Sequence, residues 1–318
     1  MVRLDDIRNA QETIAGRVHR TPLFSSRSLS EEVGAPVFLK AESLQKTGSF
    51  KVRGALNRVR RLGADERARG VIGVSAGNHA QGLAWAASLE RVPCTVVMPV
   101  HAAAAKVAAT RAYGAGVVLH GSVFELWDKC QELQREHGYT LVHPFDDPLV
   151  IAGQGTVGIE ILDDLPNTDA VVVPVGGGGL ISGIAAAVKA LRPAAKLIGV
   201  EPVGAPAVHA ALEAGHVVRL ERVDTIADGL APPSTGELAL AHVRELVDEM
   251  VLVTDDEILH ALRFVLQRAK LLLEPAGAAG IAALLAHKWR PPAGARVVAV
   301  ASGGNVDLPR LASFLQET

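Results

Sequence analysis

Lys51 is the residue whose surroundings most clearly predict chemistry. It lies in the segment GSFKVRG at residues 48–54. The small Gly48-Ser49 step allows the backbone to approach a ligand closely, and Phe50 can cover a flat ring. An amine in this setting is suited to forming a Schiff base with an aldehyde cofactor. The chain contains nine lysines, so the choice of such an amine is narrow.

Four consecutive glycines, Gly176, Gly177, Gly178 and Gly179, form a second candidate site. They follow an apolar run and precede a helical pattern. In a strand–loop–helix unit, successive backbone N–H groups can surround a phosphate, and the helix N-terminus adds roughly +0.5 charge. The loop is neither a Walker loop nor a dinucleotide fingerprint, because no Gly-Lys-Ser/Thr follows and Ile181 replaces the third fingerprint glycine. A tight turn needs only one or two glycines, so four favour a phosphate-binding loop.

The loop Ser75-Ala76-Gly77-Asn78-His79 also follows an apolar run and opens a helical pattern. Its exposed N–H groups suit a carboxylate, and the Ser75 hydroxyl and the Asn78 amide can add hydrogen bonds. A plain Ser/Asn helix cap explains the same residues equally well. We expect His79 to be a packed or capping histidine rather than an acid–base residue.

Ser302 follows the apolar run 297–301 and begins the segment Ser302-Gly303-Gly304-Asn305. The C-terminal end of a strand is where α/β sheets place side chains that face a ligand. A hydroxyl offered to a pyridine nitrogen leaves that nitrogen neutral, whereas a carboxylate would favour its protonation. A simple Ser-Gly turn is the alternative interpretation.

Short apolar runs alternate with helical patterns along most of the chain, which predicts an α/β fold. The runs are unbroken Val/Ile/Ala stretches with both faces buried, as in parallel sheets flanked by helices. Thr254 is a plausible cap for a long amphipathic helix, and Pro275 suits the first turn of the next. The expected strands are 71–74, 94–98, 116–119, 170–175, 196–200, 250–253 and 297–301, and the expected helices are 78–88, 104–113, 122–137, 180–191 and 255–273.

Composition excludes several other classes of protein. The net charge is −2 and aromatic residues make up 4% of 318 residues, so neither nucleic acid nor an anionic membrane surface is an expected partner. Cys94 and Cys130 form no C-x-x-C pair, so neither a disulfide framework nor a cysteine zinc site is expected. The uncharged stretch 170–188 is long enough for a membrane span, but its glycines fit a strand, a loop and a helix better. We expect a protein of the reducing cytoplasm.

Taken together, these segments resemble the fold-type II pyridoxal-phosphate (PLP) enzymes, specifically the threonine dehydratase and serine racemase group. The resemblance covers nearly the whole chain in the right order. It implies a fold like that of the tryptophan synthase β subunit, with two domains that each contain a mostly parallel sheet. Residues 1–68 and 147–318 would form the large PLP-binding domain and 69–146 a small mobile domain. The matching segments are 48–54, 75–79, IAGQGT at 151–156, 176–179, ADG at 227–229, Glu274-Pro275 and 302–305.

The same resemblance implies a role for each candidate residue. Lys51 would form the Schiff base with PLP and later remove the substrate's Cα proton. The cofactor phosphate would protonate the leaving hydroxyl, and the products would be a 2-oxo acid and ammonia. The other roles are Phe50 against the cofactor ring, Asn78 on the ring's 3′ oxygen, Gly176 to Gly179 on the phosphate, Ser302 at the pyridine nitrogen and Ser75, Ala76, Gly77, Asn78 and His79 around the substrate carboxylate.

This chain departs from the family pattern at two positions, one that bears on the reaction and one that bears on metal binding. Serine racemase carries a second acid–base serine in this loop, and Ala76 stands there in this chain, which favours a dehydratase over a racemase. The family's divalent-cation site resembles Glu201, a carbonyl near Ala205 and an acidic side chain, but the last position is Ala207. Loss of one oxygen ligand weakens cation binding, so we expect no metal.

Alternatives remain open at this point. Threonine and serine differ by one methyl group, worth only ~1–3 kcal/mol in an apolar pocket, and 3-hydroxyaspartate is a further candidate substrate. An amino-acid racemase of the same family and a non-catalytic PLP carrier are the competing functions. We expect no C-terminal regulatory domain, and a homodimer or dimer-based homo-oligomer by resemblance alone.

Overall fold

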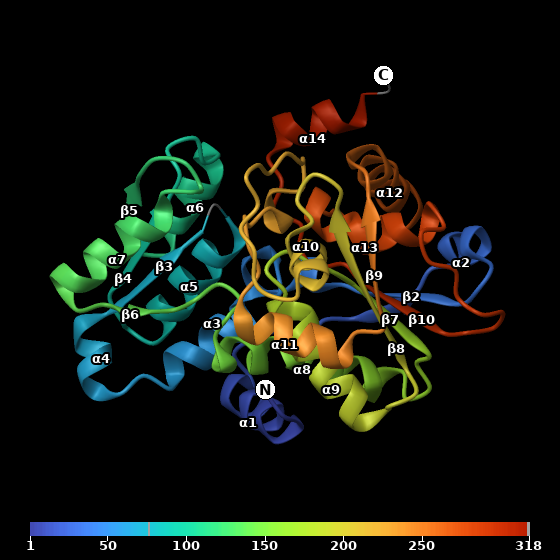
Figure 1. Ribbon diagram of the computed structural model, residues 1–318, viewed down its shortest axis with the longest axis horizontal. Helices are drawn as coiled ribbons and strands as arrows, with labels where there is room; N and C mark the ends of the chain where they lie inside the picture. Colours follow the sequence, from blue (N-terminus) through green and yellow to red (C-terminus); the bar gives the residue numbers. More distant parts are fainter. Residues whose placement is uncertain (76, 317–318) are drawn as a thin grey trace.

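Two sheets organise the chain in the computed structural model, which describes residues 1–75 and 77–316 (Figure 1). The larger sheet has six strands in the order β1-β2-β10-β7-β8-β9. Its neighbouring strands are parallel except for the antiparallel pair β1 and β2. These strands are β1 Leu23–Ser25, β2 Val37–Lys40, β7 Ala170–Pro174, β8 Lys196–Pro202, β9 Glu249–Val253 and β10 Val297–Val300.

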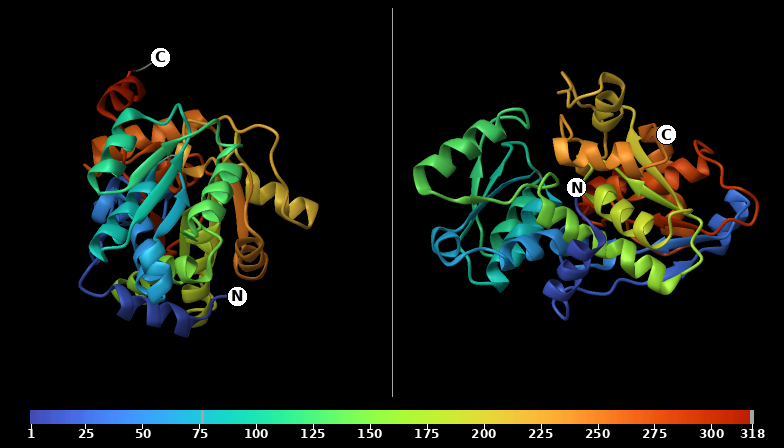
Figure 2. Two further views of the ribbon diagram at one scale, coloured as in Figure 1. Left: turned by 90° about the vertical axis from the view of Figure 1, so that its left-hand side faces the viewer. Right: turned by 60° about the horizontal axis from the view of Figure 1, so that its bottom comes forward.

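The smaller sheet has four parallel strands in the order β5-β4-β3-β6. Figures 1 and 2 show it to one side of the six-stranded sheet, with its own helices around it. All four strands lie within the segment 69–146 expected to form the small domain; the domain boundaries and the mobility stay predictions. The strands are β3 Val71–Val74, β4 Cys94–Met98, β5 Gly116–Leu119 and β6 Thr140–Leu141.

Helices cover both sheets, as the unbroken apolar strands predict. The N-terminal helix α1 packs on α8 and α9 beneath the larger sheet (Figure 2). The helices are α1 Leu4–Ile14, α2 Arg27–Val33, α3 Lys51–Arg60, α4 Ala64–Arg69, α5 Asn78–Leu89, α6 Ala104–Ala112, α7 Leu126–His137, α8 Pro148–Asp164, α9 Gly179–Leu191, α10 Ala207–Ala214, α11 Glu237–Leu246, α12 Asp255–Arg268, α13 Pro275–Leu285 and α14 Leu308–Leu315. Three short 3-10 helices are η1 Glu42–Leu44, η2 Lys46–Gly48 and η3 Asp228–Leu230.

Most expected elements are confirmed, and the differences have local causes. Helix α12 ends at Arg268 instead of residue 273, because Lys270 has a left-handed φ of 58° that a helix cannot contain. Helix α7 begins at Leu126 instead of residue 122, because the Glu125 carboxylate accepts hydrogen bonds from the N–H and hydroxyl of Ser122 and forms a turn first. Strands β1 and β2 are short and were not expected.

The stretch 170–188 divides into β7, a glycine loop and most of α9, as expected. No helix within the described part of the chain is long and apolar enough to cross a membrane.

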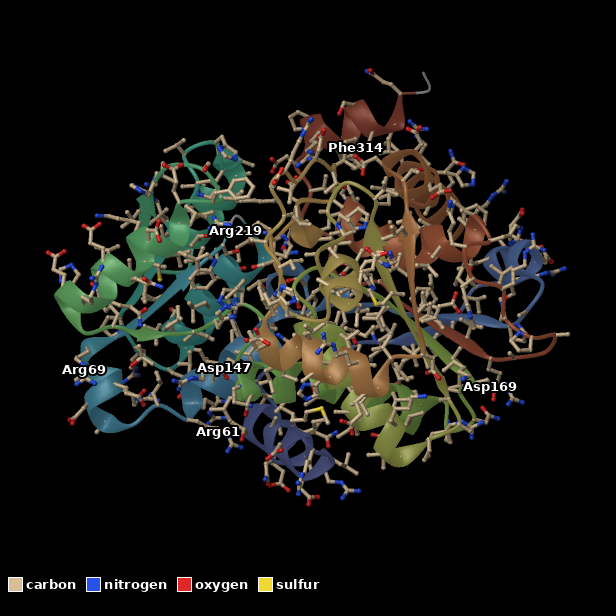
Figure 3. The ribbon with its side chains drawn as sticks, viewed as in Figure 1. Arg61, Arg69, Asp147, Asp169, Arg219 and Phe314 are labelled. Atoms are coloured by element: carbon tan, nitrogen blue, oxygen red, sulfur yellow. The ribbon has the colours of Figure 1, made fainter. Side chains whose placement is uncertain are left out.

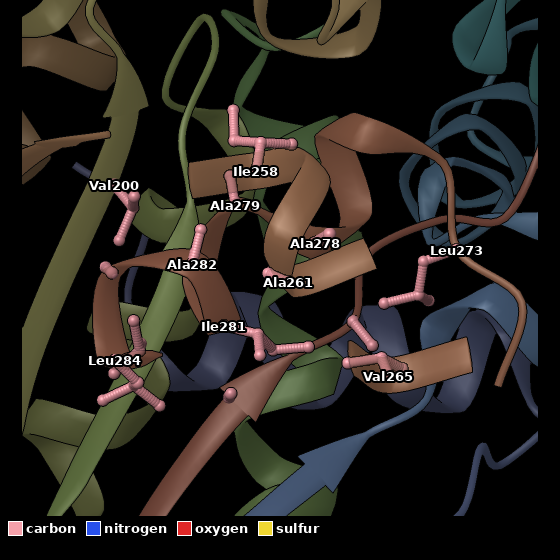
Figure 4. Close-up of a cluster of buried hydrophobic side chains, with 14 of the residues drawn as sticks. Val200, Ile258, Ala261, Val265, Leu273, Ala278, Ala279, Ile281, Ala282 and Leu284 are labelled. Atoms are coloured by element: carbon pink, nitrogen blue, oxygen red, sulfur yellow. The ribbon is translucent and has the colours of Figure 1, made fainter. Parts of the chain in front are cut away.

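The largest apolar cluster lies where α12 and α13 pack against the six-stranded sheet. Figure 4 shows Ala261 and Val265 of α12 near Ile281 of α13, and Ile258 of α12 near Ala279 of α13. These side chains are almost fully buried. Burial of these apolar side chains stabilises the six-stranded sheet. Strands β7 and β10 belong to this sheet, and candidate site residues follow the C-terminal end of each.

Candidate active site

A cavity of about 690 Å³ lies between the two sheets, and it brings the expected site residues together. Lys51 and Phe50 enter it from the start of α3, and Ser302 enters from the end of β10. The carboxyl ends of parallel strands meet at one edge of a sheet, which explains why loops far apart in sequence converge here. The lining also includes Ser75, Gly77, Asn78, His79 and all four glycines of 176–179.

Lys51 is the first residue of α3 and is partly buried. Its Nζ donates a hydrogen bond to the Pro144 carbonyl oxygen at 2.7 Å. Burial lowers the pKa of Lys51 to about 8. A larger fraction of this amine is therefore neutral at pH 7 than of an exposed lysine, and the neutral amine is the form that attacks a carbonyl or accepts a proton.

A close helix crossing fixes the start of α3. A Cβ on Gly54 would lie 2.6 Å from the Val150 carbonyl oxygen, and a Cβ on Gly153 would lie 2.6 Å from the Gly54 Cα atom. Helices α3 and α8 can therefore approach this closely only with glycine at both positions. The contact places Lys51, one turn before Gly54, at a fixed depth in the cavity.

A buried ionic network lies directly behind Lys51. The Arg53 guanidinium donates to Glu42 Oε1 at 2.8 Å and to Glu160 Oε1 at 2.7 Å, and Lys40 Nζ donates to Glu160 Oε2 at 2.7 Å. All four side chains are almost completely buried. Two positive and two negative groups balance each other, so the network holds α3 without leaving a net charge. Sequence reasoning missed it, because its members are spread over 120 positions.

The two residues before Lys51 tie the start of α3 to the segment that follows β10. The Phe50 N–H donates to the Ser302 carbonyl oxygen at 3.2 Å, and Ser49 forms a β-bridge with Gly303. The Phe50 ring centroid lies 5.1 Å from Lys51 Nζ. Ser302 and Lys51 therefore enter the same cavity from paired backbone segments.

The glycine loop connects β7 to α9. Gly178 is the N-cap of α9 and has a left-handed φ of 92°. The Phe145 ring lies against the loop so closely that a Cβ on Gly177 would overlap it, and a Cβ on Gly179 would lie 2.7 Å from the Phe145 carbonyl oxygen. The first N–H groups of α9 have no partner within the helix and point to the cavity end of the loop. The loop is thus a narrow cradle of backbone N–H groups that suits a phosphate.

The Ser75 hydroxyl accepts a hydrogen bond from the Gly77 N–H at 3.0 Å, which shapes the loop before α5. His79 is buried, and its Nε2 lies 2.9 Å from the Val142 carbonyl oxygen. Burial and the nearby Lys51 charge lower the pKa of His79 to about 3, so the ring is neutral and packed. Ala76, the position used to separate dehydratase from racemase, lies outside the described residues.

The Glu201 side chain caps the start of α10. Its carboxyl oxygens accept hydrogen bonds from the N–H groups of Val208 at 2.7 Å and His209 at 2.8 Å, at the start of α10. Burial raises the pKa of Glu201 to about 8. Ala205 and Ala207 are buried beside it and offer no side-chain oxygen. Within residues 1–75 and 77–316, no group of three or more His, Cys, Asp or Glu residues is arranged to hold a metal ion.

Charged residues at the rim of the cavity connect the two halves of the molecule. Lys106 of α6 lies 3.5 Å from Asp228, which Arg310 also contacts at 3.0 Å. On another side of the rim, Arg219 Nη2 donates to the Phe124 carbonyl oxygen at 2.7 Å (Figure 3). Asp228 belongs to the ADG segment at 227–229, but Lys106, Arg219 and Arg310 were not singled out from the sequence, since single charged residues give no local signal.

Known proteins resemble this chain over almost its whole length. A family model described as "Pyridoxal-phosphate dependent enzyme" matches residues 14–303. The chain belongs to this family. An L-threonine ammonia-lyase of Thermotoga maritima is 48% identical over 97% of this chain and 77% of its own length. A catabolic L-threonine dehydratase, TdcB, of Staphylococcus aureus is 47% identical over 99% of this chain and 92% of its own.

Solved structures confirm the expected fold. A threonine deaminase from T.th. superposes with a TM-score of 0.90 at 46% identity, covering 96% of this chain and 99% of that one. A maize serine racemase has a TM-score of 0.94 at 38% identity, covering 98% and 96%. The expected family and the expected cofactor, PLP, are both confirmed. The cavity fits PLP, because an amine with a lowered pKa and a glycine loop at a helix N-terminus both line it.

Proposed function

We propose that this protein is a PLP-dependent ammonia-lyase that converts L-threonine to 2-oxobutyrate and ammonia, and L-serine to pyruvate and ammonia. The observation that carries the proposal is that the Lys51 amine, the glycine cradle and the Ser75–His79 loop line one cavity. The named activities of the relatives that are 47–48% identical agree with it.

In the proposed site, Lys51 would hold PLP as a Schiff base and the backbone N–H groups of 176–179 would hold the phosphate. Phe50 would lie beside the cofactor ring, Ser302 would face the pyridine nitrogen and Asn78 would face the ring oxygen. Bound PLP supplies an electron sink for the charge that develops at the substrate's Cα atom.

The protein's own groups supply binding, orientation and proton transfer. The N–H groups at the start of α5 bind the substrate carboxylate, together with Ser75. Lys51, with its lowered pKa, is the base that would take the Cα proton on Nζ. His79 has too low a pKa to compete for this proton. Loss of the Cα proton and the β-hydroxyl group gives the unsaturated amine, which hydrolyses to the 2-oxo acid and ammonia.

The likeness to maize serine racemase favours amino-acid racemisation as a second candidate activity. Racemisation needs an acid on the face of Cα opposite Lys51, and the sequence offers alanine at position 76. We therefore infer that racemisation is slow, and that Ala76→Ser raises it. Residues 69–146 are proposed to move as one domain that closes over a small amino acid. We also propose that the protein is cytoplasmic and forms a homodimer.

One experiment separates these activities. The purified protein with PLP is incubated separately with L-threonine, L-serine and 3-hydroxyaspartate, and the oxo acid and the chirality of the remaining amino acid are measured. We expect oxo acid with the remaining substrate still L, and none from Lys51→Ala. D-amino acid forming faster than oxo acid would contradict the proposal, as would a native protein that gives no product.

A further inference from the structure

The side chain of Asn78 is held at both ends. Its Oδ1 accepts a hydrogen bond from Asn305 Nδ2 at 2.8 Å, and its Nδ2 donates to Glu274 Oε1. Asn78 itself lines the cavity, whereas Asn305 does not. Asn305 therefore lies behind the cavity lining, and Asn78 is a lining residue that its side chain contacts.

A backbone carbonyl sets the direction of this chain of amides. Asn305 Nδ2 also donates to the Thr47 carbonyl oxygen at 2.7 Å. A carbonyl oxygen can only accept, so the NH₂ group of Asn305 must face Thr47, and its two hydrogens are then used by Thr47 and Asn78. The atom of Asn78 that meets Asn305 must be the acceptor Oδ1. Its Nδ2 then has one hydrogen for Glu274 and one hydrogen left over.

Glu274 would set this direction only while its carboxyl group is ionised. It is almost fully buried, and burial raises the pKa of its carboxyl group. A protonated carboxyl group can donate as well as accept, so it would tolerate either orientation of the Asn78 amide. The Thr47 carbonyl has no such freedom, and Asn305 transmits that constraint to Asn78.

The backbone at residues 47–48 is shaped to fit Asn305. Thr47 and Gly48 both have left-handed φ angles, 58° and 74°. A Cβ on Gly48 would overlap Asn305 Oδ1, so the contact needs glycine there. A left-handed φ is unusual for threonine, and it is maintained in the segment that leads directly to Lys51.

We infer that Asn305 is a positioning residue that orients the Asn78 amide so that an N–H group, not the carbonyl oxygen, faces the cofactor's ring oxygen. This inference rests on the proposed contact between Asn78 and PLP. A ring oxygen that carries negative charge accepts hydrogen bonds and is repelled by a carbonyl oxygen, so a reversed amide would weaken PLP binding and change its absorbance.

Asn305→Asp tests the inference, because aspartate keeps the shape of asparagine and loses both donors. PLP is titrated into apoprotein, and the visible spectrum of the PLP-bound protein is recorded from pH 6 to 9, without substrate. We expect roughly tenfold weaker PLP binding and a shifted pH dependence of the visible band. The exposed Asn167→Ala should match the native protein. A spectrum and PLP affinity equal to native in Asn305→Asp would overturn the inference.

A double-mutant cycle keeps the test decisive if Asn305→Asp fails to fold. Asn305→Ala is compared in the native background and in Asn78→Ala. If Asn305 acts through Asn78, its effect on PLP affinity disappears once Asn78 is alanine. An equal loss in both backgrounds would show a general structural role and refute the inference. PLP affinity and the visible spectrum are both measured without turnover. Failure of the proposed lyase activity would therefore appear separately, as a protein that binds PLP normally but forms no oxo acid.

Discussion

Lys51 and Pro144 join the two parts of the active site through one hydrogen bond, from Lys51 Nζ to the Pro144 carbonyl oxygen at 2.7 Å. Lys51 begins α3, and Pro144 follows β6 of the four-stranded sheet. The next residue, Phe145, packs against Gly177 of the phosphate cradle. A single short segment therefore contacts both the reactive amine and the glycine loop.

The lowered pKa of Lys51 predicts how PLP attachment depends on pH. Attachment needs the neutral amine, and with a pKa of about 8 roughly a tenth of Lys51 is neutral at pH 7, against less than one part in a thousand for an ordinary lysine. The rate should rise with pH and level off above about pH 8. Stopped-flow absorbance after mixing apoprotein with PLP measures it. A rate that still rises tenfold per pH unit between pH 9 and 10 would refute the shift.

Local sequence patterns were enough to predict most of the strands and the main candidate residues. The unbroken apolar runs predicted parallel strands, and the segments around Lys51, Gly176 to Gly179 and Ser302 each combine a strand or helix boundary with residues that suit a ligand. These segments converge because the carboxyl ends of parallel strands meet at one edge of a sheet. The structure places them around one cavity.

Contacts between distant segments could not be predicted in the same way. Asn305 was part of a recognised segment, yet its partner is the Thr47 carbonyl, 258 positions away. Phe145 and Lys106 belong to loops and helices with no distinctive pattern, and their importance depends on how two sheets approach each other. No local pattern indicated the left-handed Lys270 that ends α12 early.

Gly177→Ala should weaken PLP binding strongly. The added Cβ would overlap the Phe145 ring, so either the ring or the phosphate cradle must move. We expect a loss of at least tenfold in PLP affinity, measured by titrating apoprotein. Gly63→Ala is the matched control, because its Cβ would meet only Glu66 Oε2 at an ordinary 3.7 Å. Equal affinities of the two variants would mean that the loop does not hold the phosphate.

Lys106→Met should raise KM more than it lowers kcat. Lys106 lies beside the carboxylate-binding loop, since a Cβ on Gly77 would be 3.3 Å from its Nζ. Its charge attracts the substrate carboxylate, and its loss removes an interaction present throughout the reaction. We expect KM for L-threonine to rise about three- to tenfold, and less so at high salt. Lys129→Met, outside the cavity, is the control. A fall in kcat with KM unchanged would contradict this interpretation.

Arg53→Met should destabilise the protein by about 3–5 kcal/mol, because it leaves the buried carboxylates of Glu42 and Glu160 without their main partner. Arg61→Met at the end of the same helix is the control: Arg61 is exposed (Figure 3), and its loss should cost under about 0.5 kcal/mol. Urea unfolding of the apoproteins measures both changes.

Because Arg53 holds the helix that begins at Lys51, the folded Arg53→Met protein should also attach PLP more slowly. Equal stabilities of the two variants would show that the network is dispensable for folding, and an unchanged rate of attachment would show that it does not position Lys51.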